Sequence, residues 1–325
     1  MKTRARFRVI GLLSILVLAQ ASRAADGPDV RWPSPEGRVF LTQPFAGSEI
    51  VLSASTRTAG AIDSLAWNGR EFLNRFDHGR ELQSAASFDG YGECLNPTEA
   101  GSDADGMGPE STSLLISLRA QDTRLHTRTR MAWWVEPGET SRECPKGPGG
   151  YASPLSDTVL TKDVEIGVHG VANAIAYRAT FSVPHAFASA NFEVLTGYMP
   201  PDFSRFWSYD PQSGRRAPLS DGPGEQPVPV ILATEDGAYA MGVYSPDLPQ
   251  AAHPDAGFGR FRFPAPRGPE GNATVKWNCV YRHGLGGPGP YAFTCYTLVG
   301  TLEAVEAGLS RLHAALSGAR TPGPR

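Results

Sequence analysis

The segment from Gly37 to Asn74, GRVFLTQPFAGSEIVLSASTRTAGAIDSLAWNGREFLN, decides the fold class. Its apolar and polar residues alternate in short runs that glycines interrupt, which is the pattern of antiparallel strands joined by tight turns. The pair Asn68-Gly69 follows the apolar Trp67, and Asn-Gly between apolar runs is the strongest short signal for a β-hairpin. The segment therefore predicts several antiparallel strands at the start of a β-sheet protein.

The same pattern recurs along most of the chain. Alternating or apolar runs occupy residues 111–120, 125–135, 157–183, 190–200, 227–246, 257–264, 273–284 and 291–302. A composition of 36 Gly, 28 Pro and only 19% charged residues is typical of chains rich in strands and turns. No repeat of 20–50 residues and no Gly/Ser linker divides the sequence. We therefore expect a mainly β fold, a large antiparallel β-sandwich that forms one domain over residues 25–325.

A single helix is expected, at the C-terminal end of the chain. Apolar residues recur at helical spacing within LEAVEAGLSRLHAAL, residues 302–316. Such an apolar stripe normally packs against the core of the same molecule. The prediction is thus one C-terminal helix that lies on the sandwich.

The N-terminal residues have the pattern of a secretory signal. Basic residues precede the short apolar run VIGLLSILVLA, and small residues follow it, so we expect residues 1–24 to be a signal peptide. The mature protein would be periplasmic or secreted, with no membrane segment after cleavage. A formal net charge of -3 argues against nucleic acid as a partner.

The four cysteines predict disulfides, because an exported chain folds in an oxidising compartment. Cys279 and Cys295 flank a glycine-rich turn and could face each other across a hairpin, which would leave Cys94 and Cys144 as the second pair. Four cysteines allow three connectivities, and the spacing does not choose among them. Zinc-ligand spacings and nucleotide-binding motifs do not occur, so no metal or cofactor is expected. The segment GSDADGMG is interpreted as a turn in preference to a calcium loop.

The segment from Asp77 to Gly106, DHGRELQSAASFDGYGECLNPTEAGSDADG, is the main candidate for a functional site. It concentrates acids, amides, a histidine and an arginine, and a long polar loop of this kind is uncommon unless it has a function. If residues 77–83 are extended, His78 and Arg80 lie on one face. A sugar site needs such donors and acceptors for neighbouring hydroxyls. The alternative is that these groups only cap turns and bond loop backbone.

Two further segments could contribute aromatic and basic groups to a ligand site. They are GYMPPDFSRFWSYDP, residues 197–211, and KWNCVYRHG, residues 276–284. Aromatic rings can stack on sugar rings, and arginine can hold a carboxylate or a hydroxyl pair. The candidate substrate-binding residues are Arg80, Gln83, Asn96, Tyr198, Arg205, Trp207 and Arg282.

Residues Gly60 to Asn74, GAIDSLAWNGREFLN, resemble the opening of the galactose-mutarotase-like sugar proteins. The resemblance implies a β-supersandwich in which a histidine acts as general acid and a glutamate as general base. His78 is the histidine next to the matching hairpin, and Glu93 and Glu99 are the glutamates that follow it. The late strands, where this group usually carries its base, contain no glutamate here, which argues against the epimerase reaction.

The sequence therefore predicts an exported protein that binds a saccharide in a polar cleft built on residues 77–99 and acts on it by acid–base chemistry. His78, Glu93 and Glu99 are the candidate catalytic residues. A polysaccharide lyase, with Arg80 neutralising a uronate, or a glycoside hydrolase using Glu93 and Glu99 are alternative enzymes. A non-catalytic periplasmic sugar-binding or structural module is the alternative without turnover.

Overall fold

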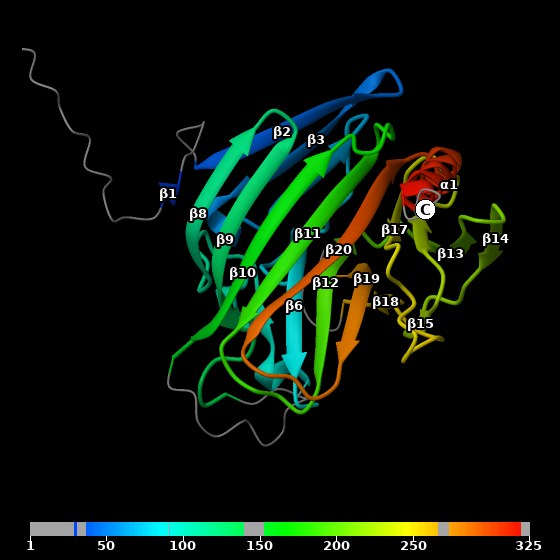
Figure 1. Cartoon of the computed structure of the whole chain (residues 1–325). Coiled ribbons are helices and arrows are strands. Elements are labelled where there is room, and N and C mark those ends of the chain that lie inside the picture. Colours follow the sequence, from blue (N-terminus) through cyan, green and yellow to red (C-terminus); the bar gives the residue numbers. More distant parts are fainter. Residues whose placement is uncertain (1–28, 31–36, 91, 140–152, 266–272, 320–325) are drawn as a thin grey trace, which may run out of the picture.

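The computed structural model describes residues 29–30, 37–90, 92–139, 153–265 and 273–319. Within these residues the chain consists of β-strands, one C-terminal α-helix and short 3-10 helices (Figure 1). Two sheets enclose the core, and their pairings are antiparallel except where β1 meets β8. This arrangement confirms the predicted antiparallel β-sandwich with one C-terminal helix. The predicted signal peptide, residues 1–24, lies outside the described residues.

The first sheet has the strand order β1, β8, β9, β10, β11, β20, β17, β16, β13 and β14. In that order the strands comprise Asp29–Val30, Leu114–Gln121, Arg124–Trp133, Leu155–Ile166, Ala174–Val183, Gly289–Gly300, Ala240–Tyr244, Val230–Ala233, Arg205–Asp210 and Arg215–Pro218. Their register aligns four buried residues in one row: Leu125, Val164, Tyr177 and Cys295. Because side chains alternate along a strand, the residues next to this row point away from the core.

The second sheet has the strand order β2, β3, β4, β6, β12, β19, β18 and β15, and β5 folds back against β4. These strands comprise Arg38–Phe45, Ser48–Ser55, Ile62–Trp67, Leu82–Phe88, Ala190–Met199, Thr274–His283, Phe258–Phe263 and Gly224–Gln226, with β5 at Arg70–Glu71. The short strand β7 (Pro97–Thr98) pairs with β6 and with β9. Hydrogen bonding therefore connects the two sheets at this point.

The predicted hairpin at Asn68-Gly69 joins β4 to β5. Both turn residues have positive φ, 51° for Asn68 and 74° for Gly69, as a type I′ turn requires. The three strands β2, β3 and β4 pair in chain order and bury Leu41, Leu52 and Leu65 in a common core. The opening segment thus folds as its alternation predicts.

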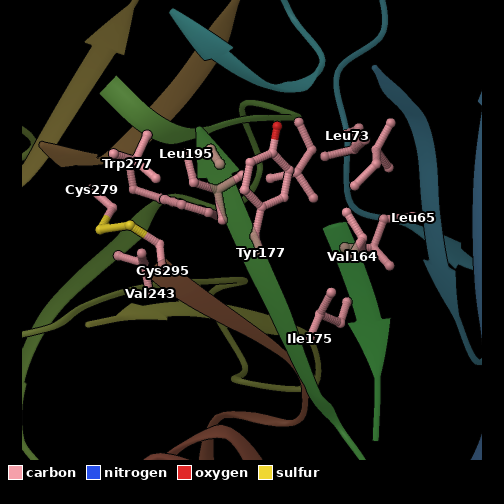
Figure 2. Packing of buried hydrophobic residues seen from close by; sticks show 14 of the residues in the cluster. Leu65, Leu73, Val164, Ile175, Tyr177, Leu195, Val243, Trp277, Cys279 and Cys295 are labelled. Atoms are coloured by element: carbon pink, nitrogen blue, oxygen red, sulfur yellow. A yellow bond between two sulfur atoms is a disulfide. The ribbon is translucent and has the colours of Figure 1, made fainter. Parts of the chain in front are cut away.

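A disulfide between Cys279 on β19 and Cys295 on β20 crosses the core (Figure 2). This pairing was one of the predicted connectivities, but the bond does not cross a hairpin. The two strands belong to different sheets, since β19 pairs with β12 and β18 while β20 pairs with β11 and β17. Cys94 is buried, and Cys144 of the other expected pair lies outside the described residues.

The predicted helix is α1, Leu302–Ala319, and it packs on β16, β17 and β20. Its apolar stripe, which includes Val305 and Leu309, is buried together with Ile231 and Leu298 of the sheet. A Cβ added at Gly242 would lie 2.7 Å from Cγ1 of Val305, so the close approach of helix and sheet requires glycine there. No helix among the described residues is long and apolar enough to span a membrane.

Candidate functional site

The polar segment begins with a turn and not with a strand, contrary to the extended conformation considered for residues 77–83. The amide of Arg80 donates to the carbonyl of Asp77, whose side chain accepts from the amide of Gly79, as aspartate does in tight turns. Trp134 packs so closely on this turn that a Cβ at Gly79 would lie 2.5 Å from its ring. Strand β6 starts only at Leu82.

A cavity of about 470 Å³ opens beside this turn. Its walls are Arg57, Glu71, Leu73, Asn74, Arg75, Phe76 and Met107. The loop that joins β5 to β6 supplies the middle of the wall, and the 3-10 helix η1 (Thr56–Thr58), which follows β3, supplies Arg57. Two guanidinium groups, a carboxylate, an amide and an aromatic ring therefore surround one space.

Glu81 lies directly behind this wall. Its side chain is fully buried, and Oε1 accepts a hydrogen bond of 2.8 Å from the guanidinium of Arg57. The second oxygen, Oε2, is buried and makes no hydrogen bond with the described residues. A buried carboxyl oxygen without a partner is unusual in a folded protein and indicates a place for a ligand atom or a proton.

Burial raises the pKa of Glu81 from its ordinary 4.5 to about 8, and the negative charge of Asp63 adds to the effect, although Arg57 and Arg75 oppose it. Asp63 itself is held by the hydroxyl groups of Ser53 and Ser55, at 2.7 Å for Ser53, and by Arg38 at 3.1 Å. Glu81 is therefore a neutral carboxylic acid at pH 7. Such an acid can donate a proton or a hydrogen bond.

Arg75 is the second unusual residue of the wall. Its φ is 58°, which is rare for a residue with a long side chain and costs conformational energy. One side of its guanidinium contacts Glu71 at 3.3 Å, while its buried Nε has no hydrogen-bond partner among the described residues. Backbone strain and an unpartnered donor at the same position are features that concentrate at ligand sites.

Glu71 fixes the shape of the wall. Its Oε1 accepts hydrogen bonds from the backbone amides of Leu65, Phe72 and Leu73, at 2.9–3.1 Å. Its Oε2 accepts a hydrogen bond from the hydroxyl of Ser64. Because both oxygens are engaged with backbone or neighbours, Glu71 holds the β5–β6 loop in place against β4.

Residues on the outer face of the second sheet form another group next to the turn. The Nζ of Lys276 lies 2.8 Å from the carboxylate of Glu193 and 5.0 Å from the ring centre of Tyr198. Burial lowers the pKa of Lys276, but Glu193 and Tyr198 outweigh burial and raise the pKa above its ordinary value. Burial also raises the pKa of Tyr198. Lys276 is thus a charged group that is fully engaged with its own neighbours.

Of the three predicted catalytic residues, two are buried and have their side-chain polar atoms bonded within the protein. His78 is 1% exposed, and its ring nitrogens lie 2.8 Å from the carbonyl oxygen of Ala100 and 2.9 Å from that of Gly108. Glu99 is 0% exposed and faces the space between the sheets. Glu93 is half-buried in the 3-10 helix η2 (Gly92–Leu95). The catalytic roles stay predictions, and His78 and Glu99 do not converge with Arg80 on a surface cleft.

Glu99 takes part in a network inside the core. Lys162 of β10 donates to its Oε1, and Tyr177 and the amide of Ser84 donate to its Oε2 at 2.9 and 3.0 Å. Lys162 also donates to the carbonyl of Gly60 at 2.8 Å. Burial lowers the pKa of Lys162, and the Glu99 carboxylate opposes this. The network joins β6, β10 and β11 through a buried ion pair.

The predicted substrate-binding residues do not gather at one place. Gln83 and Asn96 bond the backbone of His78, Ala86 and Ala100, as in the alternative interpretation of the segment. Arg80 pairs with Asp77 and lies over the ring of Phe76, beside the cavity. Tyr198 contacts Lys276, as described above. The other predicted substrate-binding residues contact protein groups: Arg205 pairs with Glu235, Trp207 lies under Arg216, and Arg282 donates to both carboxylate oxygens of Glu225.

Little in the sequence pointed to the residues that form the cavity. Arg57 and Arg75 stand alone in the short connections STRTAG and LNRF, and neither belongs to a motif. Glu81 was located within the polar segment, but its role depends on burial that the sequence does not display. The one available signal for the location of the cavity was the hairpin at Asn68-Gly69, because its second strand ends where the β5–β6 loop starts.

No metal centre is found in the part of the chain that the structure describes, where no three His, Cys, Asp or Glu residues come together. The segment interpreted as a turn is the 3-10 helix η3 (Asp103–Asp105). The carboxylate of Asp105 accepts hydrogen bonds from the amides of Ser102 and Thr112, both at 2.8 Å. Its oxygens therefore bind the loop itself.

Comparison with known proteins gives a loose likeness of fold. No protein-family model and no curated protein matches the chain. Similar solved structures include a protein from Synechocystis sp. PCC 6803, 9% identical, which matches over 81% of this chain and 96% of that chain with a TM-score of 0.41. A galactose mutarotase-related enzyme from Lactobacillus acidophilus is 8% identical over 81% of this chain and 98% of that chain, with a TM-score of 0.40.

A third similar structure is a heparan sulfate lyase from Pedobacter heparinus. It is 8% identical, has a TM-score of 0.42, and matches over 84% of this chain but only 36% of its own length. The similar structures thus include a galactose mutarotase-related enzyme, the kind of protein that residues 60–74 resemble. At these identities and TM-scores, no role of any residue is taken from these proteins.

Proposed function

We propose that the chain is an exported saccharide-binding protein whose ligand occupies the cavity of about 470 Å³, and that Glu81 supplies proton transfer to that ligand. The observation that carries the proposal is the buried Glu81 with an unpartnered oxygen behind Arg57. The cavity supports the binding of a saccharide, and the signal-like N-terminus supports export. The Cys279–Cys295 disulfide fits an oxidising compartment.

The composition of the wall suits a sugar ring. Arginine and amide groups can donate to neighbouring hydroxyls, and the ring of Phe76 offers an apolar face against which a sugar can stack. The Nε of Arg75 is a further donor that has no hydrogen-bond partner among the described residues. A volume of about 470 Å³ lies within the range of small-molecule sites.

The proposed chemistry assigns the acid to Glu81. With a pKa of about 8 it holds its proton at neutral pH, and a general acid is most effective when its pKa lies near the working pH. Arg57 contacts both Glu81 and the cavity, so it orients the carboxyl group and stabilises the anion that forms after the proton leaves. Glu71 holds the loop and takes no part in the proton transfer.

Binding is tested on a glycan array with the wild-type chain and the Arg75→Gly variant. Glycine adopts a φ of 58° without strain, so this change removes the guanidinium and keeps the backbone. We expect the wild type to bind at least one saccharide and Arg75→Gly to bind it about tenfold or more weakly, with no loss of thermal stability. Glu49→Gln, an exposed position on β3, is the control and should bind as the wild type. Equal binding by Arg75→Gly would overturn the proposed location of the site.

Turnover is tested with each bound saccharide by polarimetry, by release of reducing ends, and by the ultraviolet absorbance of an unsaturated uronyl product. These three measurements separate the epimerase, hydrolase and lyase reactions. Activity should fall as the pH rises through about 8, and Glu81→Gln should bind the saccharide but lose most of the activity. Binding without any product would show a non-catalytic module and would remove the proton-transfer part of the proposal.

A further inference from the structure

A larger cleft, of about 780 Å³, lies on the outer face of the first sheet. Its walls come from the β8–β9 turn and from strands β8 to β11, and they include Arg119, Arg124, His126, Asp163, Glu165 and Arg178. None of these residues belongs to the cavity beside Glu81. The cleft is therefore a separate place for a ligand, and the proposed function leaves it without a role.

The sheet register places four polar residues of this cleft in one row. Arg119 is opposite His126, His126 is opposite Asp163, and Asp163 is opposite Arg178. The flanking residues Leu125 and Val164 are buried in the core, so the polar row points outward because side chains alternate along strands. Two cations thus stand at the ends of a row whose centre is a histidine–aspartate pair.

His126 has a defined orientation. Its Nδ1 lies 2.8 Å from Oδ1 of Asp163, and because a carboxylate only accepts, Nδ1 is the donor. Neutral imidazole then carries its lone pair on Nε2, which makes no hydrogen bond with the described residues. The ring is 39% exposed, so Nε2 can accept a hydrogen bond from a hydroxyl group that enters the cleft.

The next row of the cleft already holds a carboxylate between guanidinium groups. Glu165 lies 2.8 Å from Arg124 and 3.6 Å from Arg178. Arg124 is 73% exposed and Arg178 is 43% exposed, so both remain accessible to solvent while they hold Glu165. The planar guanidinium group pairs well with carboxylates, and the two arginines are spaced to share one.

We propose that this cleft binds a sugar acid, a ligand that carries a carboxylate and neighbouring hydroxyl groups, such as a uronate. The carboxylate competes with Glu165 for Arg124 and Arg178, and a hydroxyl group donates to Nε2 of His126. A neutral sugar satisfies only the histidine, and a simple carboxylate satisfies only the arginines. A hydroxy acid is selected because it can interact with the histidine and with the arginines at the same time.

The proposal is tested by calorimetric titration of the full chain with glucuronate and with glucose. We expect saturable binding of glucuronate and no detectable binding of glucose at the same concentrations. Arg178→Gln and His126→Ala should each weaken glucuronate binding about tenfold. Glu165→Gln should strengthen it several-fold, because the ligand carboxylate then meets no competitor. Arg215→Gln, at an exposed position on β14, is the matched control and should have no effect.

Three outcomes would overturn the proposal. Equal affinity for glucose and glucuronate would remove the role of the arginines. Weaker binding by Glu165→Gln would show that Glu165 supports the site and does not compete with the ligand. Loss of glucuronate binding in Arg75→Gly, with Arg178→Gln unchanged, would place the ligand in the cavity beside Glu81. The last outcome would leave the proposed function intact, so the two proposals fail separately.

Discussion

Glu81 and Glu99 show how similar glutamates acquire different roles from their surroundings. Both are fully buried, and they are only 18 positions apart in the chain. Glu99 meets a lysine, a tyrosine hydroxyl and a backbone amide, so both of its oxygens are engaged. Glu81 meets a single arginine and keeps one oxygen unpartnered. This unpartnered oxygen is the reason why the proposed proton transfer is assigned to Glu81 and not to Glu99.

The raised pKa of Glu81 predicts a pH dependence of stability. Between pH 4.5 and about 8 the folded chain holds a proton on Glu81 that the unfolded chain has lost, so stability falls as the pH rises through this range. Each pKa unit corresponds to about 1.4 kcal/mol, and the contribution is therefore several kcal/mol. Urea unfolding at pH 5 and at pH 8.5 should show this loss, and Glu81→Gln should reduce it strongly. An unchanged pH dependence in Glu81→Gln, relative to Glu49→Gln, would contradict the raised pKa.

The ion pair of Glu99 with Lys162 predicts a second effect on stability. Lys162→Met leaves the carboxylate of Glu99 buried without its cation, which should cost about 3–5 kcal/mol of unfolding free energy. The double variant Lys162→Met with Glu99→Leu removes both charges and should be more stable than Lys162→Met alone. Chemical denaturation of the three chains measures this, and a double variant less stable than the single one would contradict a simple ion-pair account.

At the scale of elements, strands β19 and β20 show what the sequence could and could not predict. Their apolar alternation predicted both strands, and the pairing of Cys279 with Cys295 was among the expected connectivities. The prediction of a hairpin between them was wrong, because a short glycine-rich connection can join two paired strands or can lead from one sheet into the other. Strand pairing depends on contacts between residues far apart in the chain, and local patterns do not contain this information.

The inter-sheet disulfide predicts a loss of stability on removal. The two cysteines are 16 residues apart, and closing a loop of about this length stabilises a fold by about 3 kcal/mol in the chain-entropy account. Cys279→Ala combined with Cys295→Ala should lower the unfolding free energy by roughly this amount while keeping the far-ultraviolet circular dichroism of a β protein. A double variant as stable as the wild type would show that the packing of the two sheets alone holds β19 against β20.

The polar segment 77–106 contains Glu81, but the residues that line the cavity beside Glu81 lie outside this segment. Its histidine and amides were chosen because they are good sugar ligands, yet they hold the loop: His78 bonds two carbonyls, and Gln83 bonds the backbone of His78 and Ala100. A long loop that crosses a sheet must satisfy its own backbone, and buried polar side chains do this. Sequence alone does not show which polar groups are used in this way.

At the scale of the whole molecule, the two sheets each present polar groups on the side away from the shared core. The first sheet exposes the row from Arg119 to Arg178, and the connections of the second sheet enclose the cavity beside Glu81. Alternation along strands makes such faces inevitable in a sandwich, so the sequence predicted that polar faces exist. The position of a cavity on such a face depends on the conformation of turns and loops, such as the loop that contains the strained Arg75. These segments have no periodic sequence pattern from which their conformation could be predicted.

The central claim is that Glu81 is the neutral acid of a saccharide site, and it is tested most directly by carbon-13 NMR of the Glu81 carboxyl group. Comparison with Glu81→Gln assigns the resonance, and a pH titration is recorded for the free chain and for the chain saturated with a saccharide that it binds. The account predicts a midpoint near pH 8 in the free chain and a clear change of the resonance on binding. A midpoint near pH 4.5, or a resonance that does not respond to the bound saccharide, would contradict it.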